Sequence, residues 1–200
     1  MKLILKEYLA SLREREELDA VLPDLLSQMG LNVLIKPSRG VAEYGVDVVA
    51  IGSIKKGEEE KLYLFSIKDG DLTRDHWSNG NQALAPSLED IKYTFIRNRI
   101  LDQFKDLKIV ICICFGGEMH SSMSDRVVSY IDENKTEKRA YEIWNGDYLA
   151  TLISAHLLSG SILPWKKKVI FNEKVININR RACFISSTLL RVSSPNFPGE

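Results

Sequence analysis

The sequence predicts an α/β protein with one central mixed β-sheet, helices on both faces and the element order αβββαβαβα. The first supporting observation is a β-hairpin pattern, in which apolar runs at 46–51 and 62–68 flank a charged link containing Gly57. The second is the segment 108–115 (KIVICICF), which is apolar on both faces as an interior strand of a covered sheet should be. Segments with helical apolar spacing lie before and between these strands, which indicates layers of helices around the sheet.

The elements before the hairpin are predicted from the spacing of apolar residues and from the proline and glycine residues that end helices or form turns. Residues 3–29 have one apolar face at helical spacing, although Pro23 removes a backbone donor and is expected to kink or split the helix. Gly30 is expected to end this helix as a C-cap. We expect a strand at 31–36 and a turn at 37–40, where Pro, Ser, Arg and Gly follow one another.

The elements after the hairpin alternate between helix and strand. Residues 70–85 are polar and are expected to form a loop over a site. The elements expected after this loop are a helix at 86–104, a strand at 108–115, a helix at 121–134, a strand at 139–144 and a helix at 148–158. Pro86 fits the first turn of its helix, and Asp147 is a candidate cap for the last one.

The length of 200 residues suits one domain of ordinary core size with an appendage. The character of the sequence changes after Pro164, where a run of three lysines precedes a possible strand at 169–178 and a tail rich in Ser, Pro and Gly. We therefore expect one domain over 1–163, and a linker or the start of a following domain over 164–200.

Composition narrows the function classes only in part. Lysine plus arginine and aspartate plus glutamate both number 27, so bulk charge neither favours nor opposes nucleic acid. Three cysteines without a C-x-x-C pair, Cys112, Cys114 and Cys183, indicate reduced core thiols in a cytoplasmic protein and argue against zinc. The N-terminus does not read as a signal peptide, and the longest apolar stretch, 148–163, is too short and polar to span a membrane.

The two hairpin strands carry polar residues where a site would form. Asp47 opens the first strand directly after the Gly45-Val46 dipeptide, and Ser66 and Lys68 share one face near the end of the second. A carboxylate and an ammonium delivered to one point could hold a divalent metal and a scissile phosphate. Taken alone, Asp47 is more simply explained as a turn cap, and Lys68 as a strand-end lysine in solvent.

The order of these motifs resembles the PD-(D/E)XK nuclease superfamily, and within it the Mrr-like restriction endonuclease branch. The residues on which this resemblance rests are Gly45-Val46-Asp47 at a strand start, Ser66-Ile67-Lys68 on the next strand, and IWNGDYLATLI near the last helix. The likeness spans about 6–158. The stretches LREREELDAVLPDLL and FSIKDGDLTRDHW are similar to nuclease domains fused to the N-terminus of large bacterial antiphage NTPases.

The resemblance implies a restriction-endonuclease-like fold and Mg²⁺-dependent phosphodiester hydrolysis, with Mn²⁺ as a substitute. Asp47 and the backbone carbonyl of Ile67 would bind the metal, and Lys68 would orient the attacking water or neutralise developing charge. Ser66 stands where the family has an acid or Gln, which either weakens metal binding or signals lost catalysis. The family's helix acid would compensate, and the candidates are Glu14, Glu16, Glu17 and Asp19, with Glu43 as another. We select Glu17 because its distance from Gly30 suits the pattern, although Glu14 lies nearest the apolar face.

The polar loop and its neighbours supply candidate contacts to nucleic acid. Arg39 and Arg74 would contact phosphates, His76 and Trp77 would line a groove, and Gln82 would touch DNA or a bound water. The alternative is an ordinary polar loop with an anchoring Trp77.

Three functions are compatible with this pattern. The first is an endonuclease that cuts double-stranded DNA in antiviral defence, as a dimer or tetramer, fused to or acting with an NTPase or sensor. The second, motivated by Ser66, is a nuclease-fold module that binds nucleic acid or a partner without cutting. The third is a Holliday-junction-like resolvase, which would prefer branched DNA.

Overall fold

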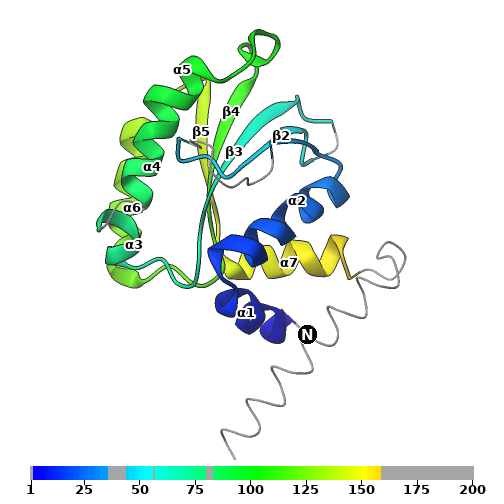
Figure 1. Cartoon of the computed structure of the whole chain (residues 1–200), viewed down its shortest axis with the longest axis vertical. Coiled ribbons are helices and arrows are strands. Elements are labelled where there is room, and N and C mark those ends of the chain that lie inside the picture. The colour runs from blue at the N-terminus through cyan, green and yellow to red at the C-terminus, as the bar shows by residue number, and fades with distance from the viewer. Residues whose placement is uncertain (1, 36–43, 56, 80–82, 159–200) are drawn as a thin grey trace, which may run out of the picture. The chain divides into compact units, whose positions relative to one another are not determined.

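The computed structural model describes residues 2–35, 44–55, 57–79 and 83–158. It confirms the predicted α/β class, because one five-stranded mixed sheet lies between two layers of helices (Figure 1). The strands are β1 (Asn32–Ile35), β2 (Val48–Gly52), β3 (Lys61–Lys68), β4 (Lys108–Phe115) and β5 (Arg139–Trp144), and they lie side by side in that order. The predicted domain boundary after residue 163 falls outside the described residues and remains a prediction.

The sheet joins an antiparallel half to a parallel half at β3. Strands β1, β2 and β3 pair antiparallel, and Val48 of β2 lies opposite Phe65 of β3, as the predicted hairpin requires. Strands β3, β4 and β5 pair parallel, with Lys68 level with Phe115 at the carboxyl ends of β3 and β4. The carboxyl end of β3 therefore lies beside the entry to β2, where Asp47 precedes the strand.

The helices divide between the two faces of the sheet. In Figure 1, α1 (Lys2–Ser11), α2 (Asp19–Gln28) and α7 (Gly146–His156) lie on one side, and α3 (Arg74–Ser78), α4 (Leu84–Asp90), α5 (Ile96–Asn98) and α6 (Ser121–Asn134) lie on the other. The π-helical turns η1 (Glu14–Leu18) and η2 (Ile91–Phe95) precede α2 and α5, and the 3₁₀ turn η3 (Asp102–Phe104) precedes β4. No helix in the described ranges is long and apolar enough to cross a membrane.

The predicted N-terminal helix is broken at a different place from the one expected. The break lies between α1 and η1, at residues 12–13, whereas Pro23 is buried inside α2. A π-helical turn, closed by the Leu18 amide bonding to the Arg13 carbonyl, connects this break to α2. Gly30 ends α2 with φ of 90°, as the expected C-cap requires, because a side chain would be strained there.

The region expected to be a loop, 70–85, contains the short helix α3, so that prediction is wrong for its centre. Thr73 begins α3 and accepts a hydrogen bond on its side chain from the His76 amide, at 3.5 Å. The following helix starts at Leu84 rather than 86, with Pro86 in its first turn as predicted. Its later part becomes η2 and α5, and it ends at Asn98 rather than at 104.

The last helix is capped by a different residue from the one expected. The Asn145 side chain accepts the Tyr148 amide at 2.9 Å, which makes Asn145 the N-cap of α7. Asp147 lies inside the first turn, where its carboxylate pairs with Lys2 at 2.8 Å and with Lys6 at 3.3 Å. These contacts tie α1 to the start of α7.

Side chains of β3 alternate between two cores. Leu62 and Leu64 belong to the apolar cluster that α4 and α6 cover, whereas Phe65 packs edge-to-face on Trp144 with ring centroids 5.0 Å apart. Cys112 and Cys114 of β4 are buried free thiols, in line with the expected core cysteines, and burial raises the pKa of both. Cys183 lies outside the described residues.

Candidate active site

The Asp47 carboxylate is fixed against the end of β3 by the backbone. Its amide donates to the Phe65 carbonyl at 2.8 Å, and its Oδ2 accepts the Ile67 amide at 2.6 Å. Because the N–H and C=O of one strand residue point to the same edge, the Ile67 carbonyl also faces the Asp47 side of β3. The structure therefore brings together the two groups that were expected to act as metal ligands.

Lys68 ends β3 and is 7 % exposed. Its Nζ lies 3.1 Å from Oε2 of Glu14, which comes from η1 and has a side chain that is 20 % exposed. A buried ammonium is costly without a partner, so this pair couples the bend before α2 to the end of β3. Three separate segments thus meet at one place: η1, the entry to β2 and the end of β3.

The structure brings Glu14, rather than the selected Glu17, to Lys68. Glu17 instead accepts the Arg13 amide on Oε2 at 2.9 Å, which stabilises the first turn of η1. Asp19 begins α2, the Glu16 side chain is not described, and Glu43 lies outside the described residues. A π-helical turn shifts the phase of every residue after it, so a count at 3.6 residues per turn from Gly30 does not point to the acid that contacts Lys68. The available signal was the position of Glu14 nearest the apolar face.

Ser66 is 1 % exposed, and its hydroxyl has no hydrogen-bond partner among the residues that the structure describes. A buried hydroxyl without a partner costs about 1–3 kcal/mol, and such groups commonly mark a place for water or an ion. Ser66 stands one residue from Ile67 and two from Lys68, so the unsatisfied oxygen belongs to the same short strand segment.

Of the predicted nucleic-acid contacts, the structure describes Arg74, His76 and Trp77, which all lie on α3. Arg74 is exposed on α3, while His76 places Nδ1 2.6 Å from the Asp71 carbonyl and Nε2 3.9 Å from Asp69 Oδ1. A carbonyl only accepts, so His76 donates from Nδ1. Arg39 and Gln82 lie outside the described residues.

Trp77 is 5 % exposed and packs in the core, where its ring meets Tyr130 edge-to-face at 5.5 Å. The anchoring alternative is therefore the one that the structure supports, and the ring is not available to stack on a base. A stacking residue must present a face to solvent, which Trp77 does not.

Replacing Trp77 with Leu is expected to lower the free energy of unfolding by about 2 kcal/mol, because apolar contacts and the ring pair with Tyr130 are lost. Urea unfolding monitored by circular dichroism measures this change. The matched control is Tyr93→Leu, at a position that is 55 % exposed, with an expected change below about 1 kcal/mol. Equal losses in the two variants would contradict the core assignment.

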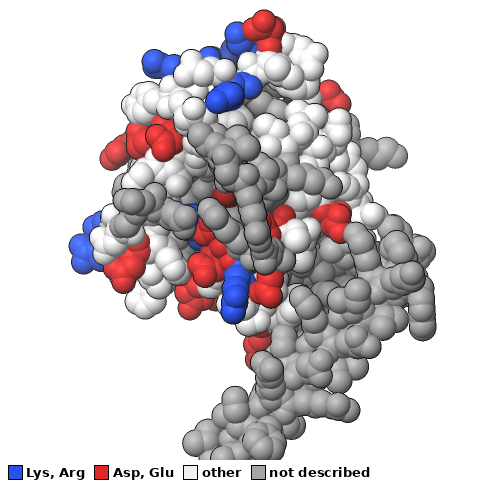
Figure 2. Space-filling view, viewed as in Figure 1, with Lys and Arg blue, Asp and Glu red and all other residues white. Residues whose placement is uncertain are grey.

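The charge around this region favours cations. On the face shown in Figure 2, acidic side chains gather in the lower centre, with few basic ones among them. The acids of the segments that meet at the site include Glu14, Glu17, Asp47 and Asp69. Such a surface attracts divalent metal and repels phosphate until metal is bound.

The candidate metal ligands at this site are all oxygen atoms. No group of three or more His, Cys, Asp or Glu side chains that could enclose a metal occurs in the described part of the chain. Mg²⁺ does not need such a cage, since it commonly takes one or two carboxylates and keeps several waters. A carboxylate before β2, with a backbone carbonyl and an unsatisfied hydroxyl at the end of β3, fits Mg²⁺ or Mn²⁺ better than zinc.

Comparisons with protein-family models, with curated proteins and with solved structures found no significant match for this chain.

Proposed function

We propose that this chain is a metal-dependent DNA endonuclease of the PD-(D/E)XK type, closest to the Mrr-like branch, with a restriction-endonuclease-like fold. The observation that carries the proposal is that the Asp47 carboxylate accepts the Ile67 amide at the end of β3, where the next residue, Lys68, pairs its buried ammonium with Glu14. The five-stranded mixed sheet with flanking helices is compatible with this fold.

Asp47, the Ile67 carbonyl and Glu14 would hold the metal. Glu14 would supply the second carboxylate, which is missing because the motif has the neutral Ser66 at its acidic position. A bound Mg²⁺ supplies an activated water and neutralises charge on the phosphate. The Ser66 hydroxyl is then the group that holds a water beside the site, since no described residue occupies its hydrogen-bonding capacity.

Lys68 has two partners in this scheme. Without substrate its Nζ pairs with Glu14 at 3.1 Å, so both charges are compensated. When the phosphate enters, the ammonium moves its hydrogen bonds to the attacking water or to a phosphate oxygen, where they stabilise negative charge that grows in the transition state. Glu14 is freed for the metal in the same exchange.

Double-stranded DNA is the proposed substrate, and cutting both strands requires a dimer or tetramer, in which two copies of the site act. The proposed setting is antiviral defence in the cytoplasm, with an NTPase or sensor domain that controls the effector. Plasmid cleavage with Mg²⁺, with Mn²⁺ and with EDTA tests the proposal. Metal-dependent conversion to linear product, rising steeply with protein concentration, supports it. Metal-independent cleavage, or none in a forced dimer, contradicts it.

A second candidate is a nuclease-fold module that binds nucleic acid or a partner without cutting. The observation that favours it is Ser66, a neutral residue at the acidic position of the motif. DNA affinity measured by fluorescence anisotropy separates the two functions. A module of this kind would bind DNA equally well with and without metal, whereas the acidic surroundings of the proposed catalytic site make affinity depend on Mg²⁺.

The Glu14–Lys68 pair can be tested without any assay of activity. Glu14→Ala is expected to lower the free energy of unfolding by about 2 kcal/mol, because it leaves a buried ammonium unpaired; the partial exposure of Glu14 reduces the effect. Adding Lys68→Met should restore most of the loss. Urea unfolding of both single variants and the double variant gives the coupling energy.

The control is the exposed pair Lys135–Asp132, at 2.8 Å on α6 and its C-cap, whose coupling should stay near or below about 0.5 kcal/mol. A Glu14–Lys68 coupling energy no larger than that of the control would show that the pair does not stabilise the site.

A further inference from the structure

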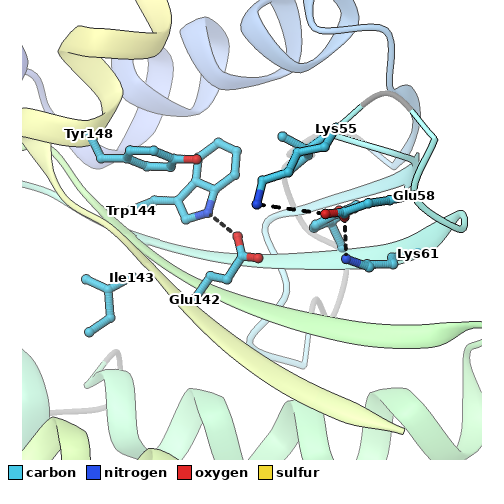
Figure 3. Close-up of a pocket in the computed structure, with 9 residues that line it drawn as sticks. Lys55, Glu58, Lys61, Glu142, Ile143, Trp144 and Tyr148 are labelled. Carbon is cyan, nitrogen blue, oxygen red and sulfur yellow. Dashed lines mark hydrogen bonds and ion pairs between the residues drawn. The ribbon is translucent and has the colours of Figure 1, made fainter.

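A cavity of about 300 Å³ lies away from the candidate active site, on the sheet face that α7 covers (Figure 3). Its walls come from four segments: the link after β2, the start of β3, the end of β5 and the first turns of α7. This volume is at the lower end of the range for small-molecule sites, roughly 300–1,000 Å³. The polar lining residues are Lys55, Glu58, Lys61, Tyr63, Glu142 and Tyr148, with the Trp144 indole beside them.

One wall of the cavity holds a carboxylate without a cation. Glu142 accepts the Trp144 Nε1 proton at 3.0 Å and forms no ion pair with any described lysine or arginine. Burial, followed by the charge of Glu142, raises the pKa of Tyr63 to about 12. This half-buried carboxylate has room for a further donor from a ligand, because Figure 3 shows only one of its two oxygens engaged by Trp144.

The opposite wall carries two ammonium groups that share one carboxylate. Lys61 Nζ lies 2.7 Å from Glu58 Oε2, and Lys55 Nζ lies 3.8 Å from Glu58 Oε1. The group has a net charge of +1, so it can accept an anion in place of, or beside, Glu58. Figure 3 shows these side chains facing Glu142 and Trp144 across the opening.

The third feature of the cavity, after the Glu142 wall and the lysine wall, is the partly exposed aromatic residue Tyr148. Tyr148 is 38 % exposed, and its ring packs edge-to-face with Trp144 at 5.2 Å, so the buried tryptophan holds it in place. An aromatic ring held on the Glu142 side of the cavity, opposite a wall that can accept an anion, suits a planar heterocycle that bears an amino group and is joined to a phosphate.

We propose that this cavity binds a nucleoside monophosphate whose base carries an exocyclic amino group. The amino group donates to Glu142, the base lies against Tyr148, and the phosphate is held by Lys55 and Lys61. The candidate active-site residues Asp47 and Lys68 do not line the cavity, so the proposal does not depend on the nuclease function.

Two pairs of probes differ only by the exocyclic amino group: cytidine against 2-pyrimidinone riboside 5′-monophosphate, and adenosine against purine riboside 5′-monophosphate. We expect calorimetric titration in EDTA to show the amino-bearing member of each pair binding roughly tenfold tighter, because a charged hydrogen bond is made only with it. Glu142→Gln should reduce this preference to about twofold or less, since a neutral amide accepts more weakly.

Variants of the basic wall give effects of opposite sign. Lys61→Gln should weaken binding of both nucleotides in each pair roughly fivefold, while Glu58→Gln should strengthen it, because the competing carboxylate is removed. Lys135→Gln, which alters an ion pair of the same spacing on another surface, is the matched control and should change nothing. Lys68→Ala should also leave affinity unchanged, which separates this site from the proposed catalytic one.

Three results would overturn the proposal. They are the absence of saturable binding at nucleotide concentrations up to about 5 mM, a base preference that persists in Glu142→Gln, and a Glu58→Gln variant that binds more weakly than wild type. Thermal unfolding of each variant confirms that it is folded under the conditions of the titration.

Discussion

Asp47→Asn is expected to lower Mg²⁺-dependent plasmid cleavage by about a thousandfold while the protein stays folded. In the wild-type protein the Ile67 N–H donates to Asp47 Oδ2 at 2.6 Å, and the asparagine side chain keeps an oxygen that can accept this hydrogen bond. The substitution removes only the negative charge that would hold the metal. Loss of a metal ligand or of a comparable electrostatic contact typically costs a factor of about 10²–10³ or more.

Asp47→Ala should abolish cleavage equally and should also lower the free energy of unfolding by about 1–2 kcal/mol, because the Ile67 amide loses its acceptor. The comparison of Asn with Ala therefore separates the chemical role of the carboxylate from its structural role. Lys68→Met tests the other half of the site and should reduce cleavage by about a hundredfold or more.

Asp106→Asn is the control for charge, since Asp106 is exposed in the turn before β4 and should leave cleavage unchanged. Cleavage by Asp47→Asn at the wild-type rate, with the same requirement for Mg²⁺, would place the catalytic centre elsewhere. A variant that loses cleavage and stability together would leave the Lys68→Met result to decide the matter, because methionine fits a buried aliphatic position.

The second large effect is expected at Gly45, two residues before Asp47. Gly45→Ala should lower the free energy of unfolding by about 3–5 kcal/mol, as measured by urea unfolding. Gly45 has φ of 77°, and an added methyl group would overlap the backbone carbonyl of Ser87 in α4. Backbone atoms cannot rotate away as a side chain can, so either α4 or the segment leading to Asp47 must shift.

Gly57→Ala is the matched control, because Gly57 has φ of 88° and no atom within 4 Å of the added methyl group. It carries the cost of the left-handed conformation alone, about 1–2 kcal/mol. The difference between the two variants measures the close approach of the Asp47 segment to α4. If both variants lost the same stability, contact with Ser87 would not constrain the entry to β2.

The strongest elements of the fold were predictable because their signals are local and redundant. Strand β4 and the helix α6 have the predicted bounds, 108–115 and 121–134, and β5 agrees at 139–144. The N-terminal helix was harder, because its break at residues 12–13 has no proline or glycine to mark it. The short helix α3 was missed because five polar-rich residues carry no apolar period.

The candidate site was predictable only where strand periodicity applies. A period of two and a hairpin are enough to place Asp47 near Lys68, and the hydrogen bond from Ile67 agrees with this. The choice of Glu14 over Glu17 required the π-helical turn, and the burial of Trp77 required the packing of α3 on α6. The cavity beside Glu142 is lined by segments that are almost one hundred residues apart in the sequence, so no local sequence motif predicts it.

The two tryptophans of the described chain stand on opposite sides of the sheet. Trp77 packs in the layer of α4 and α6, whereas Trp144 is fully buried in the layer of α7, against Phe65. Each indole is thus an intrinsic emitter confined to one layer. Single-tryptophan forms of the protein would report the loosening of the two layers separately, without an attached dye. Trp144 also lines the proposed nucleotide cavity and donates to Glu142, so we expect its quantum yield to change when a ligand binds there.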